Sequence, residues 1–122
     1  MTVLNSRRTI FESILLMLQA IKLVISGQVQ QVGYRWFAVQ EASSRGIVGY
    51  VCNLANGSVE VVAQGDSGAL SIFYEKLRNG PKLARVDDVT VTAMPIEKER
   101  VVFRVRVEET GRKNGTISTI NS

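Results

Sequence analysis

The chain has 122 residues, of which 45% are hydrophobic and 21% charged, and this composition is that of one ordinary globular domain. It contains no histidine and one cysteine, which excludes Ser-His and Cys-His nucleophiles, phosphohistidine chemistry, an internal disulfide and most zinc sites. The formal charge of +4 favours anionic partners, but the basic residues are scattered rather than gathered into a nucleic-acid-binding arm.

Residues 1–16 form an N-terminal extension ahead of the first clear strand. A secretory signal peptide is one interpretation, with Arg7-Arg8 as its basic start, but Glu12 and Ser13 interrupt the apolar run and no small-x-small cleavage site follows. The run is also too short to span a membrane. Translation from Met17 is a further alternative. A short amphipathic helix is predicted from the apolar residues at helical spacing, which are Ile10, Phe11, Ile14, Leu15 and Leu18.

The first strand is predicted over residues 21–26, a short apolar run that a glycine follows. A helix is then predicted over about 34–45, ending near Gly46. We interpret Trp36 on this helix as partly buried packing rather than as a platform for substrate. The residues that form its apolar face are Tyr34, Phe37, Ala38 and Ala42.

Two further strands are predicted over residues 47–53 and 58–64, and the turn Ala55-Asn56-Gly57 joins them as a hairpin. RNA-binding proteins of comparable architecture stack bases on aromatic residues in their central strands. The strand over 58–64 has no aromatic residue, so we do not expect an RNA partner.

The second helix is capped by Asp66 or Ser67 and ended by Gly80-Pro81. Strands are predicted over residues 86–93 and about 101–107, the last of which alternates apolar residues with arginines. The core stripe of the second helix, at spacings i, i+3, i+4 and i+7, consists of Leu70, Phe73, Tyr74 and Leu77.

The order βαββαβ plus a final strand predicts an α+β fold of the ferredoxin-like sandwich type, with two helices on one face of an antiparallel sheet. Residues 110–122 are rich in Gly, Ser, Thr and Asn, and they predict a flexible C-terminal tail.

One segment between the first strand and the first helix is suited to binding a small anion, and it runs Gly27-Gln28-Val29-Gln30-Gln31-Val32-Gly33-Tyr34-Arg35. The first N–H groups of a helix have no partner inside the helix, so they can point together at a phosphate-sized anion. Arg35 adds a guanidinium that can bind two oxygens at once. A cation at this end of a helix is disfavoured by the helix dipole, which favours a functional role for Arg35.

A second segment, Gly49-Tyr50-Val51-Cys52-Asn53, leads through three residues to Gly57-Ser58-Val59, and Gly65 closes the strand that follows. Together the two segments resemble the signature of the acylphosphatase family. That signature is Gly-x-Val-Gln-Gly-Val-x-aromatic-Arg, then Gly-aromatic-x-x-Asn, three residues, Gly-x-Val and a later Gly. The resemblance covers about residues 21–107 and implies an acylphosphatase-like domain over residues 17–109.

The sequence departs from this signature at two positions. Cys52 stands where a long basic or amide side chain is common, and we interpret it as a small strand residue whose side chain projects away from the loop. Gln31 stands where the family has its second loop glycine. If that position needs a positive φ, we expect Gln31 to add backbone strain at the site.

The resemblance implies an acylphosphatase, which hydrolyses the carboxyl-phosphate bond of acyl phosphates to a carboxylate and inorganic phosphate without a metal, a cofactor or a covalent intermediate. It implies two catalytic residues: Arg35, which holds the phosphoryl group, and Asn53, which holds the attacking water. The phosphate-binding loop that it implies comprises Gln30, Gln31, Val32, Gly33, Tyr34 and Arg35.

The alternative function is that of a catalytically weakened, phosphate-binding module with the same ferredoxin-like fold. We expect a small-molecule acyl phosphate as substrate, inorganic phosphate as product, and no nucleic-acid or membrane partner. We also expect a monomer. A single cysteine fits a reducing compartment, so a cytoplasmic location is predicted.

Overall fold

The computed structural model describes residues 17–107 of the chain. The predicted C-terminal tail and most of the predicted N-terminal helix therefore lie outside the described residues. Leu18, predicted as part of that helix, is instead the first residue of the first strand. The elements in chain order are β1 (Leu18–Gln28), α3 (Tyr34–Ser43), β2 (Val48–Asn53), β3 (Val59–Asp66), α4 (Ser67–Asn79), β4 (Arg85–Met94) and β5 (Phe103–Val105).

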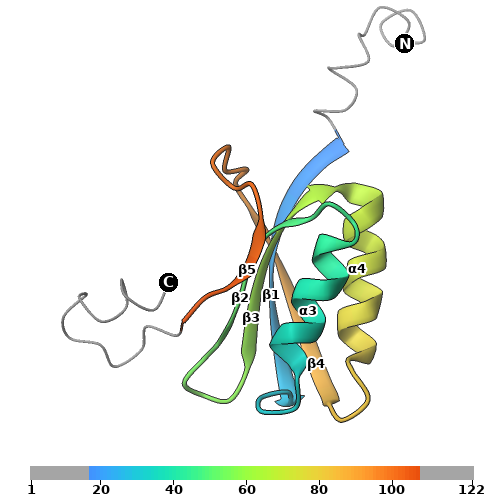
Figure 1. Cartoon of the computed structure of the whole chain (residues 1–122), viewed down its shortest axis with the longest axis vertical. Helices are drawn as coiled ribbons and strands as arrows, with labels where there is room; N and C mark the ends of the chain where they lie inside the picture. The colour runs from blue at the N-terminus through green and yellow to red at the C-terminus, as the bar shows by residue number, and fades with distance from the viewer. Residues whose placement is uncertain (1–16, 108–122) are drawn as a thin grey trace, which may run out of the picture.

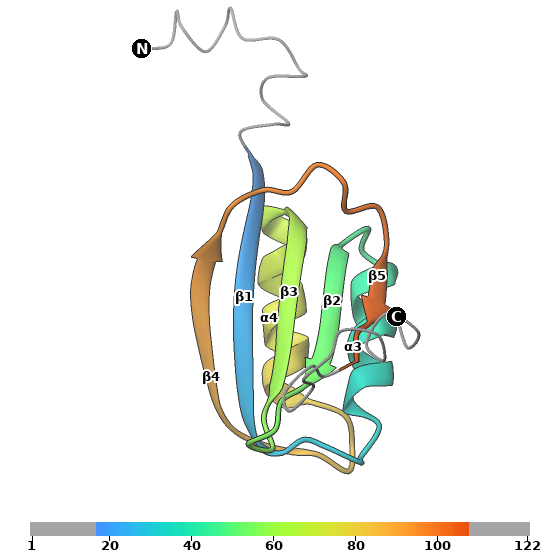
Figure 2. The same cartoon turned by 90° about the vertical axis from the view of Figure 1, so that its left-hand side faces the viewer.

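The five strands form one sheet in the order β4-β1-β3-β2-β5, and both helices cover the same face of it (Figure 1, Figure 2). The four longer strands pair antiparallel with their neighbours. This arrangement confirms the predicted α+β, ferredoxin-like fold. The last strand, β5, pairs parallel with β2, so the sheet is mixed at this edge rather than antiparallel throughout.

The parallel pairing of β5 follows from the path of the chain after β4. The chain leaves β4 at one edge, crosses the end of the sheet and returns along the far edge beside β2 (Figure 2). Gln64 of β3, only 8% exposed, holds this crossover. Its Nε2 donates to the carbonyl of Glu97 over 2.9 Å, and its Oε1 accepts from the N–H of Glu97 over 2.8 Å.

The first and last strands, β1 and β5, differ most in length from the prediction. β1 has 11 residues, because it pairs with β3 on one side and with β4 on the other, and this pairing satisfies backbone groups beyond the apolar run. β5 has only three residues, because β2 is its sole partner, and Val101 and Val102 ahead of it are exposed. Hydrophobic alternation shows which residues can form a strand but not how far a neighbouring strand runs beside it.

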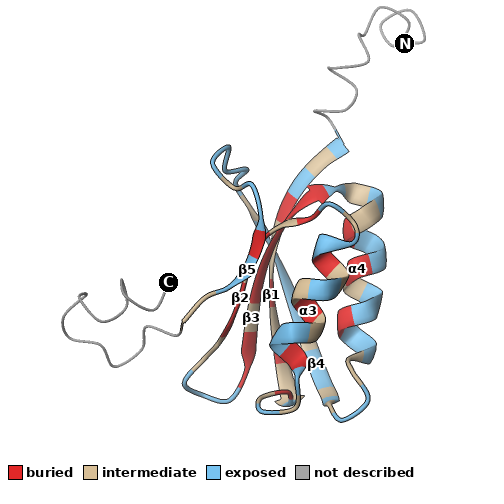
Figure 3. Ribbon diagram, in the orientation of Figure 1, coloured by how far each residue is buried: buried red, intermediate tan, exposed pale blue. Residues whose placement is uncertain are grey.

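The core lies between the sheet and the two helices, where buried residues from both layers face each other (Figure 3). Asp66 is the N-cap of α4, and its carboxylate accepts from the N–H groups of Gly68 and Ala69. Within residues 17–107, neither helix is long and apolar enough to cross a membrane. The helical residues that are buried in the core are Tyr34, Ala38, Ala42, Leu70, Phe73 and Leu77.

Candidate active site

The two sequence motifs meet at one end of the sheet, where the β1–α3 loop lies at the same end as the β2–β3 turn (Figure 1). The side chain of Gln30 joins them. Its Nε2 donates to the carbonyl of Leu54 over 2.8 Å and to the carbonyl of Ser58 over 2.9 Å. The sequence placed Gln30 in the phosphate-binding loop but predicted no role for its side chain. Its side-chain partners lie 24 and 28 residues away, so no local spacing pointed to them.

Gly27 is the second-to-last residue of β1 and lies where the register between β1 and β4 shifts. Its φ is 130°, and a Cβ at this position would lie 2.1 Å from the carbonyl oxygen of Arg85. Only glycine fits so close to a neighbouring strand. Gly27 therefore lets the chain turn out of the sheet and into the anion loop.

Gln31 has a φ of 64°, and it is the only residue other than glycine with a positive φ in the part of the chain that the structure describes. This is the position of the family's second loop glycine. The left-handed conformation costs a residue with a Cβ about 1–2 kcal/mol. The position does have a positive φ, so the backbone strain expected at Gln31 is present.

Helix α3 begins directly after this loop and has no side-chain cap on its N-terminus. Its N-cap is Gly33, whose carbonyl accepts the first helical hydrogen bond from the N–H of Phe37 over 3.0 Å. The N–H groups ahead of Phe37 precede this first helical bond and are suited to an anion.

Arg35, the second residue of α3, is exposed, and its guanidinium makes no hydrogen bond or ion pair with any residue between 17 and 107. Its position at the positive end of a helix and its lack of a local carboxylate leave the guanidinium available for an external anion. The hollow that it borders has a volume of about 310 Å³ and is lined by Val29, Gln31, Gly33, Tyr34, Arg35, Trp36 and Val105.

Asn53 is the last residue of β2 and pairs in register with Val59 of β3. Its side-chain oxygen, Oδ1, is buried and has no hydrogen-bond partner, which is true of no other buried side-chain nitrogen or oxygen among the described residues. An unsatisfied buried acceptor costs about 1–3 kcal/mol, so such an atom calls for a functional explanation. Asn53 does not line the hollow beside Arg35; the link between them is Gln30, which binds the carbonyl of Leu54 next to Asn53.

Tyr34 is buried, and its hydroxyl donates to the carbonyl of Leu77 in α4 over 2.6 Å. Its burial raises the pKa of the phenol well above its usual value. The Tyr34 side chain therefore anchors α3 to α4, and only its backbone N–H is available to the loop.

Trp36 is 69% exposed, so the interpretation of this residue as partly buried packing is wrong. The buried face of α3 is formed by residues four positions apart, Tyr34 and Ala38 among them. Trp36 lies two positions from each, which places it on the opposite side of a helix with 3.6 residues per turn. Its side chain lines the hollow beside Arg35 instead.

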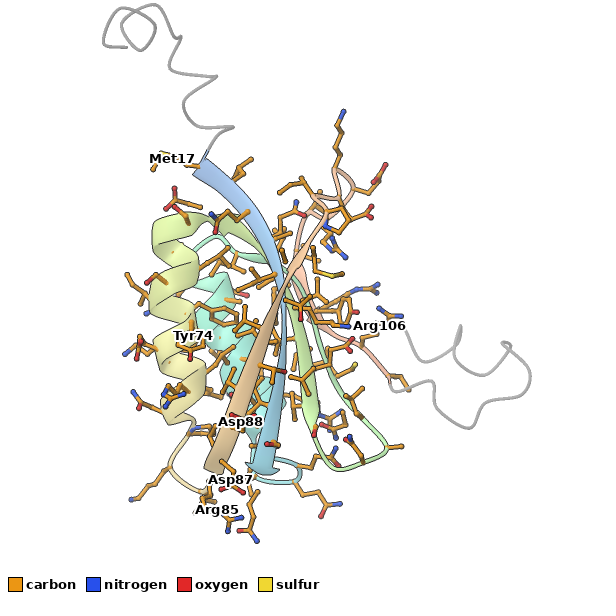
Figure 4. All side chains as sticks on the ribbon, turned by 180° about the vertical axis from the view of Figure 1, so that it is seen from behind. Met17, Tyr74, Arg85, Asp87, Asp88 and Arg106 are labelled. Atoms are coloured by element: carbon orange, nitrogen blue, oxygen red, sulfur yellow. The ribbon has the colours of Figure 1, made fainter. Side chains whose placement is uncertain are left out.

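Tyr50, the aromatic residue of the second motif, packs on the sheet face away from the helices. Its hydroxyl donates to Oε2 of Glu60 over 2.9 Å, and the guanidinium of Arg106 lies 4.4 Å from the centre of its ring. Figure 4 labels Arg106, which lies on the side of the sheet away from the helices. Burial, followed by the hydrogen bond to Glu60, raises the pKa of Tyr50 to about 12. A hollow of about 420 Å³ beside it contains neither Arg35 nor Asn53 in its lining.

Comparison with known proteins identifies the family. The family model described as "Acylphosphatase" matches residues 21–105. An acylphosphatase of Thermus thermophilus is 50% identical over 68 residues, which cover 56% of this chain and 77% of that protein. An acylphosphatase of Bifidobacterium longum is 44% identical over 85 residues, covering 69% of this chain and 88% of that protein.

The fold agrees with solved structures as well. The crystal structure of the acylphosphatase from Bacillus subtilis matches with a TM-score of 0.69 at 35% identity, covering 73% of this chain and 98% of that one. Sequence, fold and the two motifs thus agree over the same segment, and the chain belongs to the acylphosphatase family.

Proposed function

We propose that this chain hydrolyses acyl phosphates. Arg35 and the backbone of residues 30–34 bind the phosphoryl group, and Asn53 binds the attacking water. The observation that carries the proposal is the buried, unpartnered Oδ1 of Asn53 at the end of β2. A module that only bound phosphate would need cationic and N–H donors. An acceptor such as Oδ1 cannot bind an unprotonated phosphate oxygen, but it can accept a hydrogen bond from water.

The phosphoryl group would be held at the N-terminus of α3. The backbone N–H groups there and the exposed guanidinium of Arg35 supply several donors and one positive charge. In the transition state negative charge spreads over the three equatorial oxygens of the phosphoryl group. Donors fixed in place by the fold stabilise that charge without having to reorganise.

The attacking water would be held by Asn53. When Oδ1 accepts one water hydrogen, a lone pair of the water oxygen is left free to face phosphorus. The new bond forms between this oxygen and phosphorus, and the bond from phosphorus to the bridging oxygen breaks, so that a carboxylate leaves. The residues that line the hollow beside Arg35 include no Asp, Glu or His. In this proposal the water proton passes to an oxygen of the substrate.

We infer further that residues 17–109 form the catalytic domain as a monomer, and that the protein is cytoplasmic. The match to the family model begins at residue 21 and ends at residue 105, so it lies inside this range. The single cysteine suits a reducing compartment. Turnover by a chain that begins at Met17, measured together with its mass in solution, tests the domain boundary and the monomer.

The experiment that tests the function is release of inorganic phosphate from acetyl phosphate and benzoyl phosphate by the purified chain. We expect turnover without added metal, inhibited competitively by inorganic phosphate. Binding of phosphate by calorimetry with no turnover of either substrate would instead support the weakened phosphate-binding module.

A further inference from the structure

Trp36 is a large apolar side chain that the packing of the protein does not use. It is 69% exposed, whereas the buried residues of the same helix are Tyr34, Ala38 and Ala42. It is also the only tryptophan of the chain. Its position directly after Arg35 places an aromatic ring beside the anion site.

The hollow beside Arg35 has two chemically different sides. Gln31, Gly33 and Arg35 form a polar side. Trp36 and Val105 contribute exposed apolar surface, and Val105 is 41% exposed. At about 310 Å³ the hollow falls at the lower end of the range for small-molecule sites, roughly 300–1,000 Å³.

Val105 reaches this hollow through the topology of the sheet. It pairs with the fully buried Val51 of β2 in the parallel β2–β5 ladder, so its side chain lies on the helix-covered face. The crossover that Gln64 holds sets this register. The apolar side of the hollow is therefore built from the start of α3 and the last strand, which are distant in sequence.

We propose that Trp36 and Val105 bind the acyl group of the substrate, and that these two residues determine how strongly an aromatic acyl group is favoured over a small one. This inference rests on the proposed function, because the phosphoryl group must occupy the loop. One bridging oxygen joins the two halves of an acyl phosphate, so a phosphoryl group held at Arg35 keeps the acyl group within reach of the neighbouring indole. A ring stacked on the indole removes apolar surface from water on both partners.

An acetyl group is too small to cover an indole, so it gains little from this contact. A single aromatic contact raises the binding affinity by about threefold to tenfold. We therefore expect the wild-type chain to have a higher kcat/KM for benzoyl phosphate than for acetyl phosphate.

The test compares kcat/KM for the two substrates in the wild-type chain, Trp36→Ala, Trp36→Phe and the control Ile72→Ala, which truncates an exposed apolar residue on α4. We expect Trp36→Ala to lower kcat/KM for benzoyl phosphate by three to ten times more than for acetyl phosphate. Trp36→Phe should restore most of the difference, and Ile72→Ala should leave the ratio of the two values unchanged. An equal loss on both substrates, or no loss on either, would overturn the inference.

A binding measurement separates this inference from the proposed function. Phenacylphosphonate replaces the bridging oxygen of benzoyl phosphate with a methylene and cannot be hydrolysed, and acetonylphosphonate does the same for acetyl phosphate. Trp36→Ala should weaken phenacylphosphonate three to ten times more than acetonylphosphonate. Absence of turnover in the wild-type chain, with this binding difference intact, would refute the hydrolase and retain the acyl site. Equal weakening of both phosphonates would refute the acyl site whatever the turnover.

Discussion

The side-chain amide of Gln30 donates a hydrogen bond to the carbonyl of Leu54 over 2.8 Å, and this bond joins the anion loop to the residue that follows Asn53. A second bond, to the carbonyl of Ser58, closes the same bridge from the start of β3. In the proposed mechanism, the distance between the phosphoryl group and the attacking water would therefore depend on the side chain of Gln30, which need touch neither. We regard Gln30 as a positioning residue.

Gln30→Ala should lower kcat by tenfold or more while weakening inhibition by inorganic phosphate much less, because Arg35 and the helix N-terminus remain. Loss of the two bonds should also lower the free energy of unfolding by about 1–3 kcal/mol, since two carbonyls lose their donor. Steady-state kinetics, phosphate inhibition and urea unfolding measure the three effects. Gln28→Ala is the matched control, because Gln28 is exposed and lies just outside the bridge. Normal kcat in Gln30→Ala would show that the bridge does not position the water.

Arg35→Ala should abolish measurable turnover and weaken phosphate inhibition, because no other cation among residues 17–107 lines the hollow. Removing one preorganised donor to a transition state costs about 10²–10³ in kcat, and loss of a charge adds to this. The melting temperature should change little, since Arg35 contacts no partner within residues 17–107. Arg78→Ala on α4 serves as the control for loss of surface charge. Activity near that of the wild type would remove Arg35 from the site.

Asn53→Ala should reduce kcat about 10²-fold and leave phosphate affinity within a few fold, because a water holder acts in the transition state more than in the ground state. The same substitution removes a buried acceptor that has no partner, so the free energy of unfolding should hold or rise by up to about 1 kcal/mol. Single-turnover kinetics measure the change in rate, and urea unfolding measures the change in the free energy of unfolding. A loss of phosphate affinity with an unchanged rate would make Asn53 a ligand clamp instead.

The raised pKa of Tyr50 predicts how stability depends on alkaline pH. Its pKa in the folded protein is about 12 against 10.0 in the unfolded chain, so the neutral phenol stabilises the fold fully below pH 10, and this contribution is lost as the pH rises towards 12. Melting temperatures between pH 9 and 12 should fall, and Tyr50→Phe should make the fall shallower. Some slope will remain, because burial raises the pKa of Tyr34 in the same direction. An identical slope in Tyr50→Phe would contradict the assignment.

Local sequence signals predicted most of the fold. The cap at Asp66 and the core stripe of α4 follow from spacings of a few residues, and both are confirmed except that Tyr74 lies at the edge of the core, partly buried. The parallel pairing of β5 was not predicted, because it depends on where the chain goes after β4 and on a bond between Gln64 and Glu97.

The candidate site, like the fold, was predicted where it depends on local spacing and not where it depends on contacts between distant residues. The positions of Arg35 and Asn53 at the end of a loop and a strand could be predicted from motif spacing. The side-chain bridge of Gln30 could not, because it joins carbonyls 24 and 28 residues away. Trp36 was misjudged because an apolar residue inside a helical pattern is normally buried, and only the angular position of the core face shows that it points outward.

Gln31→Gly tests whether the loop stores strain. The left-handed backbone at Gln31, with φ of 64°, costs about 1–2 kcal/mol that glycine would relieve. Glycine also raises the entropy of the unfolded chain, at a cost of about 0.4–1 kcal/mol. The net gain in the free energy of unfolding should therefore lie between about 0 and 1.6 kcal/mol. If relaxation also improves the alignment of the loop donors, turnover should rise by up to about fivefold.

The matched control is Gln40→Gly, at an exposed position inside α3. Glycine there relieves no strain and should destabilise the protein by about 0.5–1 kcal/mol. Urea unfolding of both variants therefore gives opposite signs if Gln31 is strained. Equal destabilisation by the two substitutions, with unchanged turnover in Gln31→Gly, would mean that the loop holds its donors in place without needing glycine. The family glycine would then reflect close approach to the ligand rather than backbone conformation.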